Sequence, residues 1–236
     1  MLNVQLSGRK GRMALALTEA LSESEACTLV APDVTNFDVF IDFSTPDGTK
    51  AALSLCLDKG KALVVGTTGL DESILSGIKS ASHSIPVVLA PNMSAGVNVL
   101  FKLAELAAQT LGEESDIEIT EAHHRHKVDA PSGTALKLGQ TIANVMGADL
   151  ESLAVYAREG HTGAREKGSI GFQSIRAGDI VGEHRVMFAG SGERLELVHK
   201  SGSRRNYAEG ALRAALWLTK KNSGLYNMQD VLGLNT

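Results

Sequence analysis

Residues 37–65 read FDVFIDFSTPDGTKAALSLCLDKGKALVV, and this stretch decides the fold. Its ends, residues 37–43 and 62–65, are short apolar runs that are typical of buried strands. Between them, Thr45-Pro-Asp-Gly48 is expected to form a turn or a helix start, and residues 49–59 have apolar side chains at helical spacing. A strand, a helix and a second strand in this order predict a βαβ unit, and therefore a parallel sheet.

The same alternation continues on both sides of this unit. We expect strands over residues 2–6 and 27–31, with a helix over 13–21 between them. On the other side, a helix over 72–82 leads to a strand over 86–90. Short apolar strands that alternate with helices predict a Rossmann-like parallel sheet for the N-terminal part of the chain.

The pattern changes after Asn92. The elements expected next are a helix over 97–111, a strand over 116–122 and a helix over 132–146. Alternating segments separated by glycines over residues 155–199 predict antiparallel strands with hairpin turns, and residues 208–218 predict a closing helix. The predicted fold class is α/β: an N-terminal Rossmann-like parallel sheet, with a second α+β domain that contains a mixed or antiparallel sheet.

Composition excludes several classes of function. The chain has 236 residues with 23 basic and 27 acidic side chains, so its net charge of −4 argues against a nucleic-acid binder with a basic face. No apolar run approaches the ~18 residues of a membrane span. The N-terminus shows no signal-peptide pattern, so we expect a cytoplasmic protein. Cys27 and Cys56 are the only cysteines, and we expect both to be buried in a reducing cytosol.

A glycine-containing loop, Gly8-Arg-Lys-Gly11-Arg-Met-Ala14, joins the first predicted strand to the first predicted helix. Free N–H groups at such a helix start, together with the helix dipole, would bind a pyrophosphate. The spacing is GxxGxxA rather than GxGxxG, so a plain glycine turn explains the pattern equally well. Arg9, Lys10 and Arg12 suit a phosphate, including the 2′-phosphate of an NADP-type cofactor; the alternative is solvated surface charge.

Three further segments follow predicted strands, where open parallel sheets bind ligands. Asp33 is the candidate for the acidic residue that binds a ribose. The small and hydroxyl residues Gly66-Thr67-Thr68-Gly69 would allow the close approach of a nicotinamide or a carboxylate. In Ala90-Pro91-Asn92-Met93, the Asn92 side chain could bond a carboxamide. For the last two segments, the alternative is an ordinary turn or cap.

The most specific motif is Glu121-Ala-His-His-Arg-His-Lys-Val-Asp-Ala-Pro-Ser-Gly-Thr134. Its three His, one Arg and one Lys combine side chains that move protons near neutral pH with a positive charge that attracts anions. Ser132-Gly-Thr134 would open a helix whose backbone donors bind a carboxylate. Alternatives are a zinc site, although three adjacent loop histidines rarely reach one metal, and a solvated basic loop. Residues 199–205 (HKSGSRR) are a second carboxylate clamp or a solvated hinge.

The stretch EAHHRHKVDAPSGTA over residues 121–135 resembles the dihydrodipicolinate reductase (4-hydroxy-tetrahydrodipicolinate reductase) family. FDVFIDFSTP, VVGTTG, APNMSAGVN and GSIGFQSIRAGDIVGEH extend the resemblance over nearly the whole chain. It implies the NAD(P)H-dependent reduction of 4-hydroxy-tetrahydrodipicolinate, a small dicarboxylate, to tetrahydrodipicolinate in diaminopimelate and lysine biosynthesis. It also implies NADPH or NADH as cofactor, no metal and a homotetramer. The implied domains are residues 1–94 plus 205–236 for the dinucleotide, and 95–204 for substrate binding and oligomerisation.

The resemblance also implies roles for individual residues. His123 is the catalytic histidine and Lys127 the proton donor. The substrate carboxylates are bound by His124, Lys127, the backbone of Gly133 and Thr134, and Arg204. The cofactor residues carried over by motif, together with Asp33, are Gly8, Arg9, Lys10, Gly11, Arg12, Met13, Gly66, Thr67, Thr68, Ala90, Pro91, Asn92 and Met93.

Two departures from the family pattern concern the cofactor. Ala14 stands where the family usually has the last glycine of the loop, and alanine still allows close helix packing. The segment over residues 32–36 is short where the family usually has a longer one that contacts the adenosine ribose. Without a firm counterpart of that acid, the cations of the glycine loop predict that NADPH is used at least as well as NADH.

Two other interpretations of the sequence remain. A dehydrogenase of the aspartate-semialdehyde type needs a thiol nucleophile. Cys27 and Cys56 fall in a predicted strand and a predicted helix, away from the histidine cluster, which argues against this class. A non-catalytic nucleotide-sensing module would need the glycine loop but not the cluster of histidines and lysine.

Overall fold

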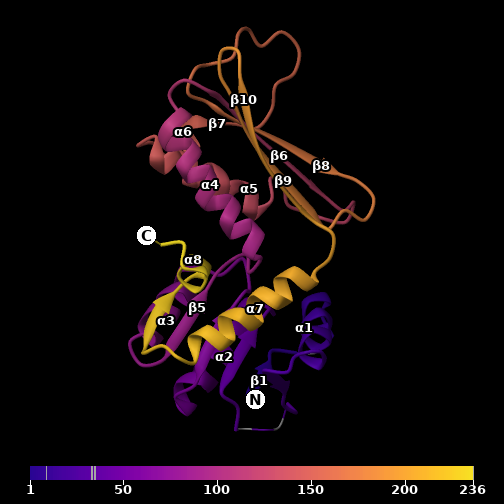
Figure 1. Ribbon diagram of the computed structural model, residues 1–236, viewed down its shortest axis with the longest axis vertical. Helices are drawn as coiled ribbons and strands as arrows, with labels where there is room; N and C mark the ends of the chain where they lie inside the picture. Colours follow the sequence, from indigo (N-terminus) through magenta and orange to yellow (C-terminus); the bar gives the residue numbers. More distant parts are fainter. Residues whose placement is uncertain (9, 33, 35, 236) are drawn as a thin grey trace. The chain divides into compact units, whose positions relative to one another are not determined.

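The structure of this protein is a computed structural model that describes residues 1–8, 10–32, 34 and 36–235. The chain forms two compact units. Unit 1 contains Met1–Asn98 together with Arg204–Thr236, and unit 2 contains Val99–Ser203. Figure 1 shows the C-terminal helix α7 lying beside the N-terminal part of the chain, so the two ends of the sequence build one unit.

Unit 1 is built on a six-stranded sheet in the order β11-β5-β4-β3-β1-β2. Its strands are β1 (Leu2–Leu6), β2 (Cys27–Leu29), β3 (Val39–Asp42), β4 (Ala62–Val65), β5 (Pro86–Leu89) and β11 (Gly224–Tyr226). Every pair of neighbouring strands is parallel. From β1 the chain passes to β2 on one side and then to β3 on the other, so the topological switch point lies between β1 and β3.

Helices cover both faces of this sheet (Figure 1). They are α1 (Arg12–Ser22), α2 (Pro46–Lys59), α3 (Glu72–Ala81), α7 (Arg205–Leu218) and α8 (Met228–Leu232). One core joins the sheet to α1, α7 and α8, with Leu17 and Ala211 among its buried members. The other core joins the opposite face to α2 and α3, with Leu53 and Ile78. This three-layer arrangement explains why β3 and β4 are buried at every position.

Unit 2 is built on a five-stranded sheet in the order β10-β9-β6-β8-β7. Its elements, with α4 beginning in the residues of unit 1, are α4 (Ala95–Leu111), β6 (Asp116–His123), α5 (Gly133–Val145), α6 (Leu150–Leu153), β7 (Ala154–Val155), β8 (Ile170–Arg176), β9 (Gly182–Ala189) and β10 (Arg194–Ser201). β9 and β10 form an antiparallel hairpin, and β9 is also antiparallel to β6. β8 is parallel to both β6 and β7.

The predicted fold class is therefore confirmed, but the expectation of antiparallel hairpins throughout residues 155–199 is wrong. Of the first expected segment only Val155 forms a strand, together with Ala154, and the chain then runs as a loop to residue 169. Arg165 fastens this loop: its guanidinium donates to Asp116, Glu118 and the carbonyls of Ile117 and Ser169. A loop of this length brings β8 back beside β6 in the parallel direction.

Helix ends follow local chemistry. α2 begins at Pro46, three residues before the predicted start, because the Thr45 side chain accepts a hydrogen bond from the Gly48 N–H at 3.2 Å and proline suits the first helical position. It ends at Gly60, whose φ of 61° lies in the left-handed region. The short elements α6, α8 and β11 were not predicted, because each is too short to show a period.

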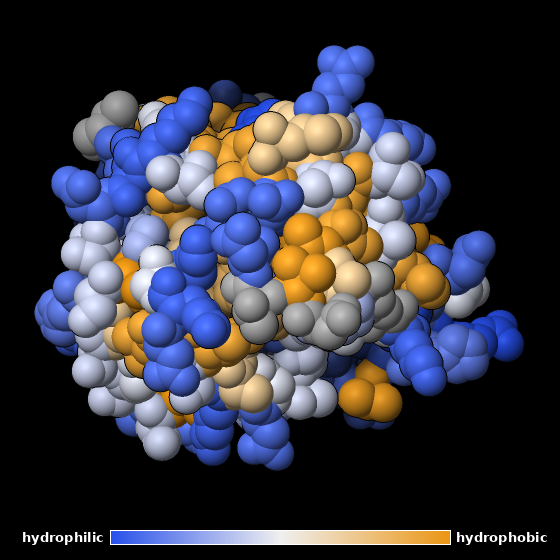
Figure 2. Space-filling view, turned by 90° about the horizontal axis from the view of Figure 1, so that it is seen from below, coloured by the Kyte–Doolittle hydropathy of each residue, from blue (hydrophilic) through white to orange (hydrophobic). Residues whose placement is uncertain are grey.

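Figure 2 shows one face of the molecule, on which hydrophilic side chains surround smaller groups of hydrophobic ones. The exposed apolar residues are spread over several elements, for example Leu15 on α1 and Leu57 on α2. Within the described ranges, no helix is both long enough and apolar enough to cross a membrane.

Candidate functional site

The carboxyl ends of β1, β3, β4 and β5 meet at one edge of the unit 1 sheet. We call the loops there, residues 7–8, 43–44, 66–67 and 90–92, the carboxyl edge. Backbone hydrogen bonds join neighbouring loops: Ser7 N–H donates to the Ile41 carbonyl at 3.1 Å, and Gly66 N–H to the Asp42 carbonyl at 2.8 Å. The edge contains the switch point between β1 and β3, which is where open α/β sheets bind ligands.

The start of α1 lies next to the switch point and has the properties of an anion site. Gly8 has a φ of 73°, which favours glycine, and no heavy atom lies within 4 Å of a Cβ built on Gly8 or Gly11. Gly11 caps α1 without a side-chain hydrogen bond, and the first turn has no acidic residue. The first N–H groups of an α-helix have no partner within the helix, and the helix dipole at this end favours an anion. Lys10 and Arg12 are exposed beside them, whereas Arg9 and Asp33 lie outside the described residues.

A buried carboxylate, Asp42 at the end of β3, organises the middle of the carboxyl edge. It accepts hydrogen bonds from the hydroxyls of Thr67 (2.8 Å), Ser44 (2.5 Å) and Thr49 (2.5 Å). The Thr67 hydroxyl also accepts from Ser44 N–H at 2.9 Å. Because the Thr67 hydroxyl is hydrogen-bonded to Asp42 and Ser44, only the backbone of Thr67 is available to a ligand. Thr68 is exposed.

Two glycines permit close approaches near this edge. A Cβ on Gly66 would lie 2.3 Å from the Phe43 ring, so the ring packs directly on the backbone of this loop. A Cβ on Gly210 of α7 would lie 1.8 Å from the Met93 carbonyl oxygen. Met93 is buried in the core, and Asn92 Oδ1 accepts from Ser94 N–H at 2.9 Å, as expected for a turn. Pro91 is exposed and Ala90 is buried.

The predicted substrate residue Arg204 lies at the N-cap of α7, in unit 1. Burial lowers the pKa of its guanidinium, and the positive charge of Arg12 acts in the same direction. The two arginines therefore share one electrostatic environment, which favours an anion. The assignment of Arg204 to a substrate carboxylate stays a prediction.

In unit 2, Glu121 and His123 lie two residues apart on β6 and so project from the same face of the sheet. The Glu121 side chain is 1% exposed, and its Oε2 lies 2.5 Å from Nδ1 of His123. Arg176, opposite His123 on β8, donates to both oxygens of Glu121 at 2.8 and 2.6 Å. Burial would raise the pKa of Glu121, but the hydrogen bonds from His123 and Arg176 outweigh it and hold that pKa far below its usual range.

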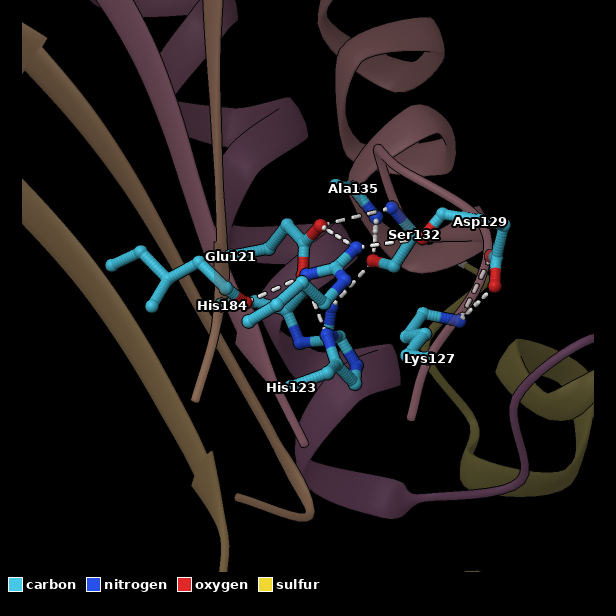
Figure 3. A network of polar contacts seen from close by, with 9 residues as sticks. Glu121, His123, Lys127, Asp129, Ser132, Ala135 and His184 are labelled. Atoms are coloured by element: carbon cyan, nitrogen blue, oxygen red, sulfur yellow. Dashed lines mark hydrogen bonds and ion pairs between the residues drawn. The ribbon is translucent and has the colours of Figure 1, made fainter. Parts of the chain in front are cut away.

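The same network reaches the start of α5 (Figure 3). Ser132 N–H donates to Oε1 of Glu121 at 3.2 Å, and the Ser132 hydroxyl accepts from Ala135 N–H at 3.2 Å as the N-cap. His184, opposite Glu121 on β9, places Nε2 3.0 Å from that hydroxyl and its ring edge-on to His123, with 5.2 Å between centroids. Burial lowers the pKa of His184 to about 3, aided by the nearby His123, so His184 is neutral at ordinary pH. We call Glu121, His123, Ser132, Arg176 and His184 the β6 cluster.

Lys127 lies in the loop between β6 and α5, where Figure 3 shows it directed at Asp129. Its ammonium donates to both oxygens of Asp129, at 2.7 and 2.8 Å. Burial opposes ionisation of Asp129, but these hydrogen bonds outweigh it and lower its pKa. His124 is half-buried on the same loop, and Gly133 and Thr134 form the first turn of α5. Unit 2 thus brings together all the predicted residues of this motif, whereas Arg204 belongs to unit 1.

Several members of these sites were not predicted. Glu121 belongs to the quoted motif, and its place two residues before His123 on a strand is the signal that could have paired them. Arg176 and His184 come from β8 and β9, and Asp42 from β3. Register of the unit 2 sheet brings Arg176 and His184 to their partners, so no local pattern marks them. Asp42 bonds to Ser44 and Thr49 nearby in sequence and to Thr67 of the next loop, and its burial inside an apolar strand hid it.

The described part of the chain contains no group of three His, Cys, Asp or Glu side chains that could hold a metal ion. Cys27 in β2 and Cys56 in α2 are buried and free, as expected. Burial raises the pKa of both thiols, that of Cys56 to about 12. Neither thiol has the properties of a nucleophile.

Comparison with known proteins adds independent information. A family model described as dihydrodipicolinate reductase, C-terminus, matches residues 96–232, and one described as dihydrodipicolinate reductase, N-terminus, matches residues 31–93. A solved dipicolinate-bound dihydrodipicolinate reductase from Paenisporosarcina sp. TG-14 is similar with a TM-score of 0.76 and 24% identity, over 98% of both chains.

More distant structures share the fold alone. A probable dehydrogenase from Thermotoga maritima has a TM-score of 0.59 and 12% identity, over 98% of this chain and 92% of that one. Aspartate semialdehyde dehydrogenase II from Vibrio cholerae has a TM-score of 0.52 and 9% identity, over 94% of this chain and 99% of that one. Their likeness shows a shared fold.

The C-terminal family model alone matches more than half of the chain, and it includes the motif at residues 121–135. The predicted family is confirmed. The family match also confirms the predicted reaction class, which is an oxidoreduction in diaminopimelate and lysine biosynthesis. It likewise confirms the predicted use of a pyridine nucleotide. This chain belongs to the dihydrodipicolinate reductase family.

Proposed function

We propose that unit 1 binds NADH or NADPH and that unit 2 binds 4-hydroxy-tetrahydrodipicolinate, which the protein reduces to tetrahydrodipicolinate. The observation that carries the assignment is the β6 cluster: an ion-paired carboxylate bonded to His123, next to Lys127 and the start of α5. The dipicolinate named for the Paenisporosarcina protein supports a small dicarboxylate as the substrate of this chain.

The carboxyl edge fits a dinucleotide. Open space over Gly8 and Gly11, the N–H groups at the start of α1 and the exposed Lys10 and Arg12 suit a pyrophosphate. The backbone of Gly66, Thr67 and Thr68 and of residues 90–93 would bind the nicotinamide end. When bound, the reduced nicotinamide supplies a hydride to a conjugated carbon of the substrate.

The substrate carries two carboxylates, and unit 2 offers groups that bind them. Gly133 and Thr134 present N–H groups at the start of α5, where the helix dipole favours an anion. His124 and Lys127 add side-chain donors from the adjoining loop. Arg204 is the proposed donor from unit 1. These contacts hold the substrate in one orientation before any bond changes.

Lys127 is the proposed general acid. Loss of the 4-hydroxyl as water first gives the conjugated cyclic imine. Addition of a hydride to its conjugated carbon leaves an enamine-like anion, which is quenched by a proton at the neighbouring carbon. Lys127 Nζ donates that proton, and Asp129 orients the ammonium through its two hydrogen bonds. His123 is proposed to face the substrate beside Lys127 and to stabilise the charge that develops.

Two further assignments follow the family resemblance and are proposals of the same kind. The protein is a homotetramer assembled through unit 2, and it works in the cytoplasm. Sedimentation at several protein concentrations tests the first, and fractionation of the source cells tests the second.

The activity itself is tested by mixing the protein with NADPH and enzymatically generated substrate and following the loss of the reduced nicotinamide absorbance. Turnover that requires both compounds supports the proposal. Binding of NADPH without turnover would instead indicate a nucleotide-sensing module. Turnover of an aldehyde substrate in place of the cyclic imine would indicate a dehydrogenase of the semialdehyde type.

A further inference from the structure

The two oxygens of Glu121 serve two different parts of the site. Oε2 meets His123 Nδ1 at 2.5 Å, while Oε1 accepts the Ser132 N–H at 3.2 Å. Arg176 donates to both oxygens, so it neutralises the charge without taking either oxygen away from its partner. A buried carboxylate with this many donors is fully hydrogen-bonded and has one orientation.

This arrangement decides the tautomer of His123. An ionised carboxylate only accepts hydrogen bonds, so Nδ1 of a neutral His123 must carry the ring proton. Nε2 is then the nitrogen left for the substrate. Arg176 balances the charge of Glu121, and His184 on the other side of the ring is neutral. The imidazole of His123 therefore has a carboxylate hydrogen-bonded to Nδ1, as in a catalytic histidine–carboxylate dyad.

The second oxygen acts on the other part of the site. Ser132 is the N-cap of α5, and Gly133 and Thr134 follow it directly. Because Glu121 binds the N–H of Ser132, it holds this cap against the end of β6. Glu121 is therefore the one side chain of the β6 cluster that bonds to both His123 and this cap, while His184 supports the cap through the Ser132 hydroxyl.

We propose that Glu121 is a positioning residue for the proposed reduction, fixing the Nδ1–H tautomer of His123 with one oxygen and the start of α5 with the other. This inference rests on the proposed function for its catalytic consequence. It assigns to Glu121 no contact with substrate or cofactor. Arg176 is its counter-ion, and Ser132 transmits its position to the helix.

The matched control is Glu118, which lies three residues earlier on β6 and so projects from the opposite face. Glu118 is also an ion-paired carboxylate, 3.0 Å from Arg158 and 3.2 Å from Arg165, and its side chain is 14% exposed. Glu118→Gln therefore removes a comparable charge from the same strand without touching His123. An equal loss of activity in both variants would indicate a general disturbance of β6 and not a specific role of Glu121.

The kinetic experiment compares Glu121→Gln with Glu118→Gln, both confirmed as folded by circular dichroism. The side-chain amide introduced by Glu121→Gln can donate to Nδ1 and so permits the other tautomer. We expect kcat of Glu121→Gln to fall about 10²-fold, since misplacement of a catalytic group by about 1 Å costs that much, with the Kd for NADPH unchanged. We expect Glu118→Gln to stay within about threefold of wild type. Equal losses in the two variants, or wild-type kcat in Glu121→Gln, would overturn the proposal.

The second measurement does not depend on turnover. In wild-type protein labelled with ¹⁵N-histidine, long-range ¹H–¹⁵N spectra report the tautomer of each ring, and His123→Asn identifies the signal of His123. We expect the Nδ1–H form in wild type and a mixture in Glu121→Gln. An Nε2–H form of His123 in wild type would overturn the role of Glu121, whereas inactivity of wild type with this tautomer intact would overturn only the proposed reaction.

Discussion

The β6 cluster and the carboxyl edge are built in opposite ways. In the β6 cluster, side chains from β6, β8, β9 and the N-cap of α5 hydrogen-bond to one another, and the charges of Glu121 and Arg176 cancel within the protein. At the carboxyl edge, one buried carboxylate, Asp42, ties the loops together. The parts proposed to face a ligand there are backbone N–H groups and exposed cations.

This difference matches the two tasks. Proton transfer depends on the orientation and protonation of particular side chains, so a network must fix them before the substrate arrives. A dinucleotide is bound over its whole length, and its pyrophosphate needs donors and space more than a preset charge pattern. Changes in side-chain chemistry should therefore damage unit 2, and changes in backbone packing should damage unit 1.

The largest effect is expected for Lys127→Ala. Loss of the general acid should lower kcat by roughly 10²–10⁴-fold and leave the Kd for NADPH unchanged. Steady-state kinetics and a fluorescence titration with NADPH measure the two quantities. Lys137→Ala, on the exposed side of α5, is the control and should stay near wild type. Turnover of Lys127→Ala within a few-fold of wild type would remove Lys127 as the donor.

For the carboxyl edge, the sharpest test is Gly210→Ala. The new Cβ would lie 1.8 Å from the Met93 carbonyl oxygen, so α7 must shift or Met93 must move. We expect the free energy of unfolding to fall by about 1–3 kcal/mol and the Kd for NADPH to rise.

Gly77→Ala in α3 is the control, because its Cβ meets only Leu53 Cδ2, at 3.6 Å. That variant should gain about 0.5–1 kcal/mol. Equal stability of the two variants in urea would contradict the close packing of α7 on Met93.

The neutral His184 makes the stability of unit 2 depend on pH. Its pKa is lowered from 6.5 to about 3, so between these values the unfolded chain binds the proton and the folded one does not. Stability from this group is complete above pH 6.5 and is lost as the pH falls. Between pH 7 and 5 we expect a loss of about 2 kcal/mol in the free energy of unfolding.

Urea titrations at several pH values test this expectation. The free energy of unfolding should vary less with pH in His184→Gln than in wild type, while His161→Gln, in the exposed loop, should behave like wild type. A similar slope in His184→Gln and wild type would show that His184 is not the group responsible.

A smaller effect is expected for His124→Ala. A carboxylate contact made equally in the ground state and the transition state changes KM and not kcat, so KM for the substrate should rise about tenfold. His126→Ala, which removes the neighbouring exposed ring, is the matched control. A collapse of kcat with unchanged KM in His124→Ala would exchange the roles proposed for His123 and His124, since His123→Ala is the variant expected to lose kcat.

The smallest effect concerns the choice of cofactor. The cations around Gly11 should let NADPH be used at least as well as NADH, and exposed contacts of this kind are screened over about 8–10 Å at ordinary ionic strength. The ratio of kcat/KM for the two cofactors should therefore move a few-fold toward NADH as salt is raised. Lys10→Ala should reduce the salt dependence. A strong preference for NADH at low salt would indicate that these cations contact the pyrophosphate or solvent and not a 2′-phosphate.

Much of unit 1 could be predicted from the sequence, since its strands are short apolar runs between helices with clear start and stop signals. β1 and β4 have their predicted bounds, and β5 differs by one residue. The sheet of unit 2 was harder, because alternation shows that a segment is a strand but not which strand it joins. β8 follows the long loop at residues 156–169 and lies beside β6 rather than in a hairpin.

The site residues also differ in how well the sequence predicts them. The residues of the EAHHRHK motif were found because they are contiguous in sequence and chemically unusual together. Arg176 and His184 were not found, because each is an ordinary residue of a strand until the register places it beside its partners. Asp42 was not found either, because a single acidic residue that ends an apolar strand does not show which hydroxyls of the following loops it binds. Contacts between distant segments carry this information, and a single sequence does not display them.

The shared core of unit 1 has a consequence for synthesis of the protein. α7 covers the sheet through Ala208 and Ala211, and β11 extends it beside β5, yet both follow unit 2 in the sequence and are translated after it. Unit 2, by contrast, is one continuous segment, Val99–Ser203. Domains usually fold in the order in which they are translated. Here the second unit is complete first, and one apolar face of the N-terminal strands stays uncovered until α7 has been translated.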